Sequence, residues 1–127
     1  MSDEATSLLL VEDEPDLREA LAEYLQACGF AVTAVATATE AFASARFHAP
    51  QILLTDLTLP DRRGDSYLEE FHQAHPECLL YVHSGDSSFV PSPSLIGCGL
   101  TSDHVLSKPA DLSAMVKKFR FDLTIKR

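Results

Sequence analysis

The chain has 127 residues, 46% of them hydrophobic and 23% charged, a composition that is typical of one globular domain and excludes an intrinsically disordered chain. Its formal net charge of -9 opposes binding to nucleic acid or anionic lipid, and no apolar stretch approaches the roughly 18 residues of a membrane span. The acidic, polar start, MSDEATS, is unlike a secretion signal, so we expect a cytoplasmic protein that binds neither nucleic acid nor membrane.

Five short apolar runs alternate with amphipathic segments, which is the pattern of parallel strands covered by helices. The predicted strands are residues 7–11, 30–36, 51–56, 78–84 and 105–107. The predicted helices begin near Pro15 and Thr37 and then cover residues 66–74, about 94–100 and about 110–120. Thr37 and Glu40 have the spacing of a capping box, which supports the second helix.

The fourth helical segment contains prolines and glycines, so we expect that helix to be short or distorted. No internal repeat or flexible linker divides the chain. We therefore predict one domain over residues 1–127, with its core at about 7–120 and a short C-terminal extension at 121–127. The predicted fold class is α/β, a flavodoxin-like (βα)5 three-layer sandwich whose parallel five-stranded sheet has the order 2-1-3-4-5.

Acidic residues follow two strands that this order makes neighbours. Glu12 and Asp13 come after the first strand, and Asp56 ends the third. Ligands of open α/β sheets bind beyond the carboxyl ends of the strands, so the three carboxylates crowd one edge. Their repulsion costs something like 1 to 4 kcal/mol per pair, and a hard divalent cation such as Mg2+ removes it. The cluster therefore predicts a metal site.

Two further strand ends carry groups that suit a phosphoryl site. Ser84 ends the fourth strand with a hydroxyl, and Lys108 follows the fifth with a compact positive charge. Phosphoryl transfer is catalysed mainly by positioning and by stabilising negative charge. We expect Ser84 and Lys108 to bind the oxygens of a phosphoryl group on Asp56.

Four motifs in this order, LLLVEDEP, TDLTLPDRRG, VHSGD and LSKP, resemble those of the response-regulator receiver family of two-component signalling, over essentially the whole chain. The resemblance implies that Asp56 accepts a phosphoryl group from a histidine kinase or a histidine phosphotransfer protein. It also implies a signalling domain that catalyses its own aspartyl phosphorylation and dephosphorylation, rather than an enzyme acting on a separate substrate.

The resemblance further implies a role for each matching residue near Asp56. Glu12 and Asp13 match the acidic pair that binds Mg2+ directly or through water, and Thr58 matches the residue that gives the metal a backbone carbonyl. Asp13 and Asp56 are then the carboxylate ligands. Thr58 and Asp86 match the two positions that border the path of hydrolytic water and tune the lifetime of the phosphoryl group.

Other matching residues lie at the ends of the fourth and fifth strands. Ser84 matches the hydroxyl residue that bonds the phosphoryl group and reports its presence, and Gly85 matches the small residue after it. Lys108 matches the family's lysine. Pro109 matches the proline that follows it, often through a cis peptide bond.

The chain departs from the family three residues before Lys108, where Val105 replaces the usual Tyr or Phe. Valine has no ring to move, so the resemblance does not carry the usual aromatic readout over to this chain. Two possibilities remain open. Either phosphorylation rearranges the loop of residues 85–93, or the domain is a phosphate sink or a phosphorylation-independent interaction module. Its output partner, or a second copy in a homodimer, would use the face formed by the fourth helix, fifth strand and last helix.

Two other functions fit the residues less well. Phosphatases of the haloacid dehalogenase type have a second acid two residues after the nucleophile, where this chain has Thr58. Flavodoxin-like binding of FMN conflicts with the carboxylates, which repel its phosphate. Outside the acidic cluster, strand alternation predicts that His83 faces the side of the sheet opposite to Ser84, as a hydrogen-bonded core histidine.

Overall fold

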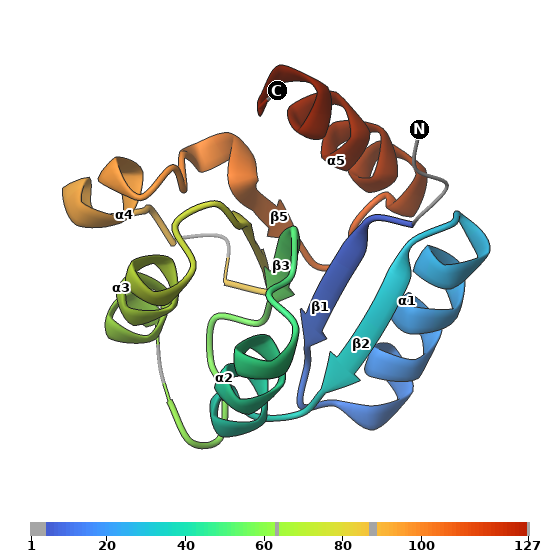
Figure 1. Cartoon of the computed structure of the whole chain (residues 1–127), viewed down its shortest axis with the longest axis horizontal. Coiled ribbons are helices and arrows are strands. Elements are labelled where there is room, and N and C mark those ends of the chain that lie inside the picture. Colours follow the sequence, from blue (N-terminus) through green and yellow to red (C-terminus); the bar gives the residue numbers. More distant parts are fainter. Residues whose placement is uncertain (1–4, 63, 87–88, 127) are drawn as a thin grey trace.

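Five parallel strands form one sheet in the order β2-β1-β3-β4-β5, which confirms the predicted topology (Figure 1). The computed structural model describes residues 5–62, 64–86 and 89–126. The strands are β1 (Ser7–Val11), β2 (Ala31–Val35), β3 (Ile52–Thr55), β4 (Leu79–Ser84) and β5 (Val105–Ser107). Strands β1 and β5 have the bounds that the sequence predicts, and the other three are shorter by one or two residues.

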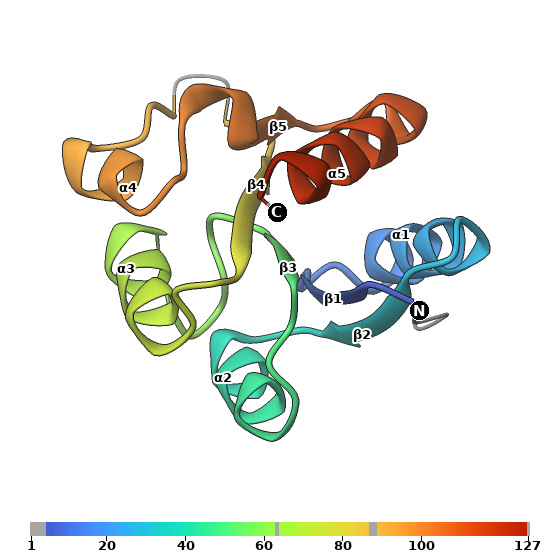
Figure 2. The ribbon, with the colours of Figure 1, turned by 45° about the horizontal axis from the view of Figure 1, so that its top comes forward.

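Helices cover both faces of the sheet, as Figure 2 shows most clearly. They are α1 (Pro15–Ala27), α2 (Ala38–Phe47), α3 (Gly64–Ala74), α4 (Pro93–Gly97) and α5 (Leu112–Lys126), and a 3-10 turn (Ser102–His104) precedes β5. Helices α1 and α5 lie on one face, and α2, α3 and α4 on the other. Within the described residues, no helix has both the length and the apolar character of a membrane span.

The core consists of two apolar layers, one on each side of the sheet. Successive residues of β1 and β3 point to opposite layers and are almost all buried. Leu9 and Leu53 contact α2 and α3, whereas Leu10 and Leu54 contact α1 and α5. Since each fully buried leucine contributes about 1.5–3 kcal/mol, these central strands anchor the fold and fix the positions of the loops that follow them.

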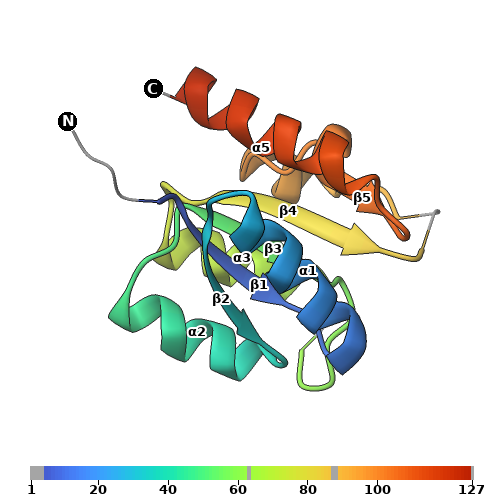
Figure 3. The same cartoon turned by 90° about the vertical axis from the view of Figure 1, so that its right-hand side faces the viewer.

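The register of the strands brings their carboxyl ends to one edge of the sheet. Val11 pairs with Thr55 of β3, and Ser84 pairs with Ser107 of β5. The N–H of Asp56 donates to the carbonyl of Val11 at 2.9 Å, which places Asp56 directly beside Glu12. Figure 3 shows β1, β2 and β4 running in one direction toward this edge.

Three helices differ from their predicted bounds. Helix α3 begins two residues earlier than predicted, at Gly64, and ends at Ala74 as expected. Helix α4 has only five residues, fewer than the predicted 94–100, because the proline at its start and Gly99 just beyond it, at φ 94°, confine it. Helix α5 begins two residues later than predicted and continues to Lys126, past the predicted end near Arg120. It continues because Leu123 still packs on the core, so residues 121–126 extend the helix.

The predicted capping box of α2 is formed with one change. The Thr37 hydroxyl oxygen accepts the N–H of Glu40 at 3.1 Å, as expected. The Glu40 carboxylate accepts the N–H of Ala36 at 2.9 Å, one residue before the position that the box predicts. The first N–H groups of α2 also donate to a carboxylate from the loop after β3, that of Asp61.

Candidate functional site

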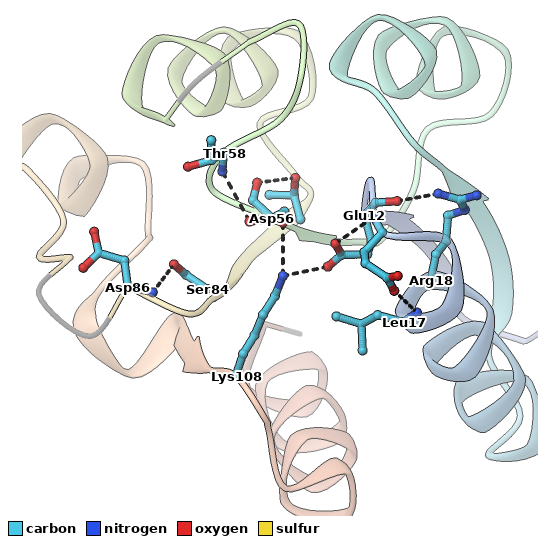
Figure 4. Close-up of polar contacts among 10 residues, drawn as sticks. Glu12, Leu17, Arg18, Asp56, Thr58, Ser84, Asp86 and Lys108 are labelled. Atoms are coloured by element: carbon cyan, nitrogen blue, oxygen red, sulfur yellow. Dashed lines mark hydrogen bonds and ion pairs between the residues drawn. The ribbon is translucent and has the colours of Figure 1, made fainter.

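Three carboxylates meet at the carboxyl ends of β1 and β3 (Figure 4). One oxygen each from Glu12, Asp13 and Asp56 lies within 4.8 Å of the others. Glu12 is buried, Asp56 is half-buried and Asp13 is exposed, so the cluster runs from the sheet edge out to solvent. The structure thus brings together the acidic residues that the sequence assigns to a metal site.

Lys108 reaches into this cluster from the end of β5. Its Nζ lies 3.0 Å from Glu12 Oε1 and 3.1 Å from Asp56 Oδ2, between the two carboxylates in Figure 4. Burial raises the pKa of Glu12, and its hydrogen bond to Lys108 opposes that rise. Burial alone lowers the pKa of Lys108, but its bonds to Glu12 and Asp56 leave it raised. Lys108 therefore contacts two of the three clustered carboxylates, and the cluster keeps an excess of negative charge.

The loop that carries Glu12 is held by the first turn of α1. Glu14 caps this helix by accepting the N–H of Leu17 at 2.6 Å, and its own N–H donates to Glu12 Oε2 at 3.2 Å. Arg18 of the same helix donates from Nη1 to the Glu12 carbonyl at 2.8 Å. Sequence reasoning did not identify Arg18, because its partner is a backbone oxygen that no motif marks.

Asp56 and Thr58 are joined at the start of the loop after β3. The N–H of Thr58 donates to Asp56 Oδ1 at 3.3 Å. The hydroxyl of Thr55 donates to the Asp56 carbonyl at 2.9 Å and lies 3.1 Å from the Tyr67 hydroxyl in the core. Asp56 is therefore held through its backbone and one oxygen, while Oδ2 faces Lys108.

Ser84 lies at the end of β4, across Lys108 from Glu12 in Figure 4. It is buried, and its Oγ accepts the N–H of Asp86 at 3.0 Å, across Gly85. The N–H of Lys108 donates to the Ser84 carbonyl at 2.9 Å, so the two residues are fixed relative to each other. The Lys108–Pro109 peptide bond is cis, as the resemblance implies.

Val105 lies close to this end of β4. It lines a cavity of about 180 Å³ together with Ser84 and Phe89. The space beside Ser84 is thus bordered by a short β-branched side chain from β5 and by a ring from the loop before α4.

His83 is buried on the face of the sheet opposite to Ser84, but the predicted hydrogen bond is wrong. It is 3% exposed, and neither ring nitrogen has a hydrogen-bond partner among the described residues. Burial, with the nearby charge of Lys108, lowers the pKa of His83 to about 4. His83 lines a cavity of about 370 Å³ that Leu17 of α1 and Leu112 of α5 also border.

A second polar cluster, absent from the sequence predictions, joins β4 and the 3-10 turn before β5 to α5. It consists of Tyr81, Asp103, His104, Lys118 and Asp122 and is called here the α5 cluster. The Tyr81 hydroxyl donates to Asp122 Oδ2 at 2.6 Å, and Lys118 Nζ lies 3.1 Å from the same oxygen and 2.9 Å from Asp103. His104 stacks on Tyr81 with centroids 4.5 Å apart and donates from Nδ1 to the Leu80 carbonyl at 2.8 Å.

Known proteins resemble the chain in both sequence and fold. A family model described as the response regulator receiver domain matches residues 8–120. The photosynthetic apparatus regulatory protein RegA of Cereibacter sphaeroides is 30% identical over 105 residues, which cover 83% of this chain and 56% of that protein. Response regulator Rre1 of Synechocystis is 32% identical over 130 residues, covering 90% of this chain and 51% of that protein. The chain spans about half the length of these curated relatives.

Solved structures share the fold at lower identity. The signal receiver domain of a putative Luxo repressor protein from Vibrio parahaemolyticus has a TM-score of 0.82 at 24% identity, over 96% of this chain and 92% of that one. A CheY-like response regulator receiver domain protein from Methanospirillum hungatei has a TM-score of 0.80 at 22% identity, over 96% of both chains.

Proposed function

Because the chain belongs to the response regulator receiver domain family of two-component systems, we propose that Asp56 accepts a phosphoryl group from a phosphohistidine donor. The observation that carries this proposal is the contact of Lys108 with both Glu12 and Asp56, inside a cluster whose carboxylates outnumber its cations. Such an arrangement is unfavourable as a structural ion pair, but it suits a site that binds cations and phosphoryl oxygens.

The donor set fits Mg2+. Carboxylates of Asp13 and Asp56, the nearby carboxylate of Glu12 and the backbone carbonyl of Thr58 would hold the ion, because Mg2+ binds oxygen ligands and keeps several waters. When bound, Mg2+ supplies positive charge that offsets the carboxylates and the phosphoryl oxygens. Because all of these donors are oxygen atoms, the set does not suit a metal ion that prefers thiolate or imidazole ligands.

The chain's own residues have separate tasks in the transfer. A carboxylate oxygen of Asp56 attacks phosphorus; a P–O bond forms, the P–N bond of the donor breaks, and its electron pair stays on the imidazole nitrogen. Lys108 offsets negative charge on the phosphoryl oxygens. The Ser84 oxygen already accepts the Asp86 N–H, so its own hydrogen is available to donate to a phosphoryl oxygen.

Dephosphorylation is the second half of the proposed cycle. Water attacks phosphorus, the bond to Asp56 breaks, and inorganic phosphate leaves. Thr58 and Asp86 lie on the loops that follow Asp56 and Ser84 (Figure 4). Their side chains are proposed to border the approach of this water. We propose that they set the lifetime of the phosphoryl group.

The donor is a histidine kinase or a histidine phosphotransfer protein, and the proposed location is the cytoplasm. The apolar surface beside Lys108, formed by Leu17 and Ala20 of α1 with Pro109 and Leu112, suits contact with an apolar helix face of such a donor. This surface borders the phosphoryl site, so a donor bound there holds its phosphohistidine close to Asp56.

The proposed function is tested by incubating the protein with acetyl phosphate and Mg2+ and following its intact mass. We expect wild type to gain one phosphoryl group, and Asp56→Asn or wild type with EDTA to gain none. Equal uptake by Asp56→Asn would place the modification elsewhere. No uptake by wild type, together with no thermal shift on adding beryllofluoride and Mg2+, would contradict the proposal.

A second candidate function rests on Val105 and the five-residue α4. Without a ring at position 105, the α4-β5-α5 face serves as a docking surface, for an output partner or a second copy, whose shape does not depend on phosphorylation. Affinity capture of partners with and without beryllofluoride separates the two functions. Capture that is independent of beryllofluoride and equal for Asp56→Asn supports the second candidate.

A further inference from the structure

A fourth carboxylate, outside the acidic crevice, ties the loop after Asp56 to helix α2. Asp61 Oδ1 accepts the N–H of Ala38 at 2.9 Å, and Oδ2 accepts the N–H of Thr39 at 2.8 Å and its hydroxyl at 2.7 Å. The hydrogen bonds from Thr39 are the main reason that the pKa of Asp61 is lowered to about 2. The carboxylate is therefore ionised over the whole working range of pH.

These bonds complete the cap of α2. The first N–H groups of a helix lack partners within the helix and favour negative charge nearby. The hydroxyl of Thr37, the N-cap, accepts the N–H of Glu40, and the N–H groups of Ala38 and Thr39 donate to Asp61 instead. The loop after β3 is thereby fixed to a helix that lies far earlier in the chain.

Other contacts also hold this loop. The N–H of Gly64 donates to the Leu57 carbonyl at 3.0 Å and that of Leu59 to the Arg62 carbonyl at 3.1 Å, but both bonds lie within the loop and its base. The Arg62 guanidinium forms a salt bridge with Glu70 at 2.9 Å. Exposed salt bridges of this kind contribute little to stability. Leu57 and Leu59 pack on the core, and the Arg62 guanidinium lies 5.8 Å from the centroid of the Phe42 ring of α2. The three bonds of Asp61 tie the described loop residues to the first residues of α2.

Thr58 lies between these attachments and Asp56. Its N–H bonds Asp56 Oδ1, and its carbonyl is the proposed backbone ligand of the metal. Residues that orient ligands without touching the ion commonly change metal affinity by about 10- to 100-fold when they are mutated. A loop released at Asp61, three residues away, lets the Thr58 peptide turn.

We propose that Asp61 is a positioning residue: by fixing the loop to α2 it holds the Thr58 peptide in the orientation that Mg2+ binding and phosphorylation of Asp56 require. This inference rests on the function proposed above. The three side-chain hydrogen bonds of Asp61 described above all go to α2, so it acts through the loop.

The test compares Asp61→Ala with Thr37→Ala. Both variants remove hydrogen bonds from the start of α2, but only Asp61 belongs to the loop after Asp56. Mg2+ is titrated by calorimetry, and the rate of phosphorylation is measured with acetyl phosphate at saturating Mg2+. We expect Asp61→Ala to weaken Mg2+ binding by about tenfold, and Thr37→Ala to stay within about twofold of wild type. Asp61→Asn, whose amide oxygen still accepts hydrogen bonds, is expected to lie between wild type and Asp61→Ala.

Amide NMR spectra without metal supply a readout that does not depend on activity. In Asp61→Ala, and more weakly in the better-capped Asp61→Asn, the Thr58 resonance shifts, whereas in Thr37→Ala it stays. Equal weakening of Mg2+ binding in the Asp61→Ala and Thr37→Ala variants, or wild-type affinity in Asp61→Ala, overturns this inference and leaves the proposed function intact. Failure of wild type itself to bind Mg2+ and to be phosphorylated overturns both.

Discussion

The crevice cluster of Glu12, Asp13, Asp56 and Lys108 and the α5 cluster are built around the same element, a lysine that contacts two carboxylates. Lys108 contacts Glu12 and Asp56 at 3.0 and 3.1 Å, and Lys118 contacts Asp103 and Asp122 at 2.9 and 3.1 Å. In the α5 cluster, Asp122 also accepts the Tyr81 hydroxyl, and His104 Nε2 lies 3.6 Å away. In the crevice cluster, the third carboxylate adds charge that Lys108 alone does not offset.

The difference separates a structural cluster from a functional one. Asp122 accepts the Tyr81 hydroxyl and pairs with Lys118, so the α5 cluster joins β4, the 3-10 turn and α5 into one unit. The crevice cluster lies at strand ends and keeps unbalanced negative charge, which favours binding of a cation. Substitutions in the first are therefore expected to change stability, and substitutions in the second to change chemistry.

The largest expected effect comes from replacing Lys108 by alanine, with the same replacement at Lys118 as the comparison. Lys108→Ala removes the charge that is proposed to offset the phosphoryl oxygens, and we expect the rate of phosphorylation by acetyl phosphate to fall by about 10²- to 10³-fold. Lys118→Ala is expected to stay within about twofold of wild type. Phosphate-affinity gels measure the initial rates of phosphorylation of the two variants and of wild type. Similar losses in the two variants would erase the distinction between the clusters.

A second prediction concerns His83, a buried group that belongs to neither cluster and that makes the stability of the fold depend on pH. Its pKa is about 4 in the folded protein and near 6.5 when unfolded, so between these values the unfolded chain binds the extra proton. Keeping His83 neutral in the folded protein therefore contributes to the free energy of unfolding fully above pH 6.5. This contribution is lost as the pH falls toward 4, by up to roughly 3 kcal/mol. We expect urea denaturation of His83→Leu to lack this part of the pH dependence.

The exposed His48 offers a matched control for that experiment. His48→Gln also removes one imidazole but keeps the buried one, so its pH profile between 4 and 6.5 should match that of wild type. A profile for His83→Leu as steep as that of wild type would show that His83 keeps an ordinary pKa or finds a hydrogen-bond partner.

A third prediction concerns the stability of the two clusters themselves. Asp122→Ala leaves the Tyr81 hydroxyl and Lys118 without their shared acceptor, and we expect the free energy of unfolding to fall by about 2 kcal/mol. Asp13→Ala, measured without divalent cations, removes only repulsion and is expected to leave stability equal or slightly higher. Urea denaturation measures both; a loss of stability in Asp13→Ala as large as in Asp122→Ala would contradict the assignment.

The smallest expected effect is stabilisation by Mg2+ alone. At a concentration ten times its dissociation constant, the ion adds about 1.4 kcal/mol to the free energy of unfolding. Asp13→Asn should reduce the gain at the same concentration, whereas Asp103→Asn, in the α5 cluster, should keep it. Thermal shifts with Mg2+ measure this. An equal gain in all three proteins would indicate that Mg2+ binds elsewhere.

The crevice cluster could be predicted from the sequence because it depends on strand ends alone. Once five apolar runs form a parallel sheet in the order 2-1-3-4-5, the residues after β1, β3, β4 and β5 meet at one edge. The α5 cluster and the cap at Asp61 depend on distant pairs instead: Tyr81 and Asp122 lie 41 residues apart, and Ala38 and Asp61 lie 23 apart. No local pattern marks such pairs.

Predictions failed where tertiary packing decided the outcome. Alternation correctly predicted that His83 is buried opposite to Ser84, but the presence of a partner depends on which helices cover it, and Leu17 and Leu112 offer none. Helix α5 passes its predicted end because Leu123 still contacts the core and Asp122 accepts the Tyr81 hydroxyl. Neither contact can be inferred from the sequence of the helix itself.

The central claim, that Asp56 is the phosphoacceptor of the crevice cluster, is tested most directly by locating the phosphoryl group. After incubation with acetyl phosphate and Mg2+, borohydride reduces an aspartyl phosphate to homoserine, which tandem mass spectrometry places on the sequence. We predict homoserine at position 56, dependent on Mg2+ and at no other aspartate. Homoserine at another position, or its complete absence under conditions in which the protein remains folded, would contradict the account.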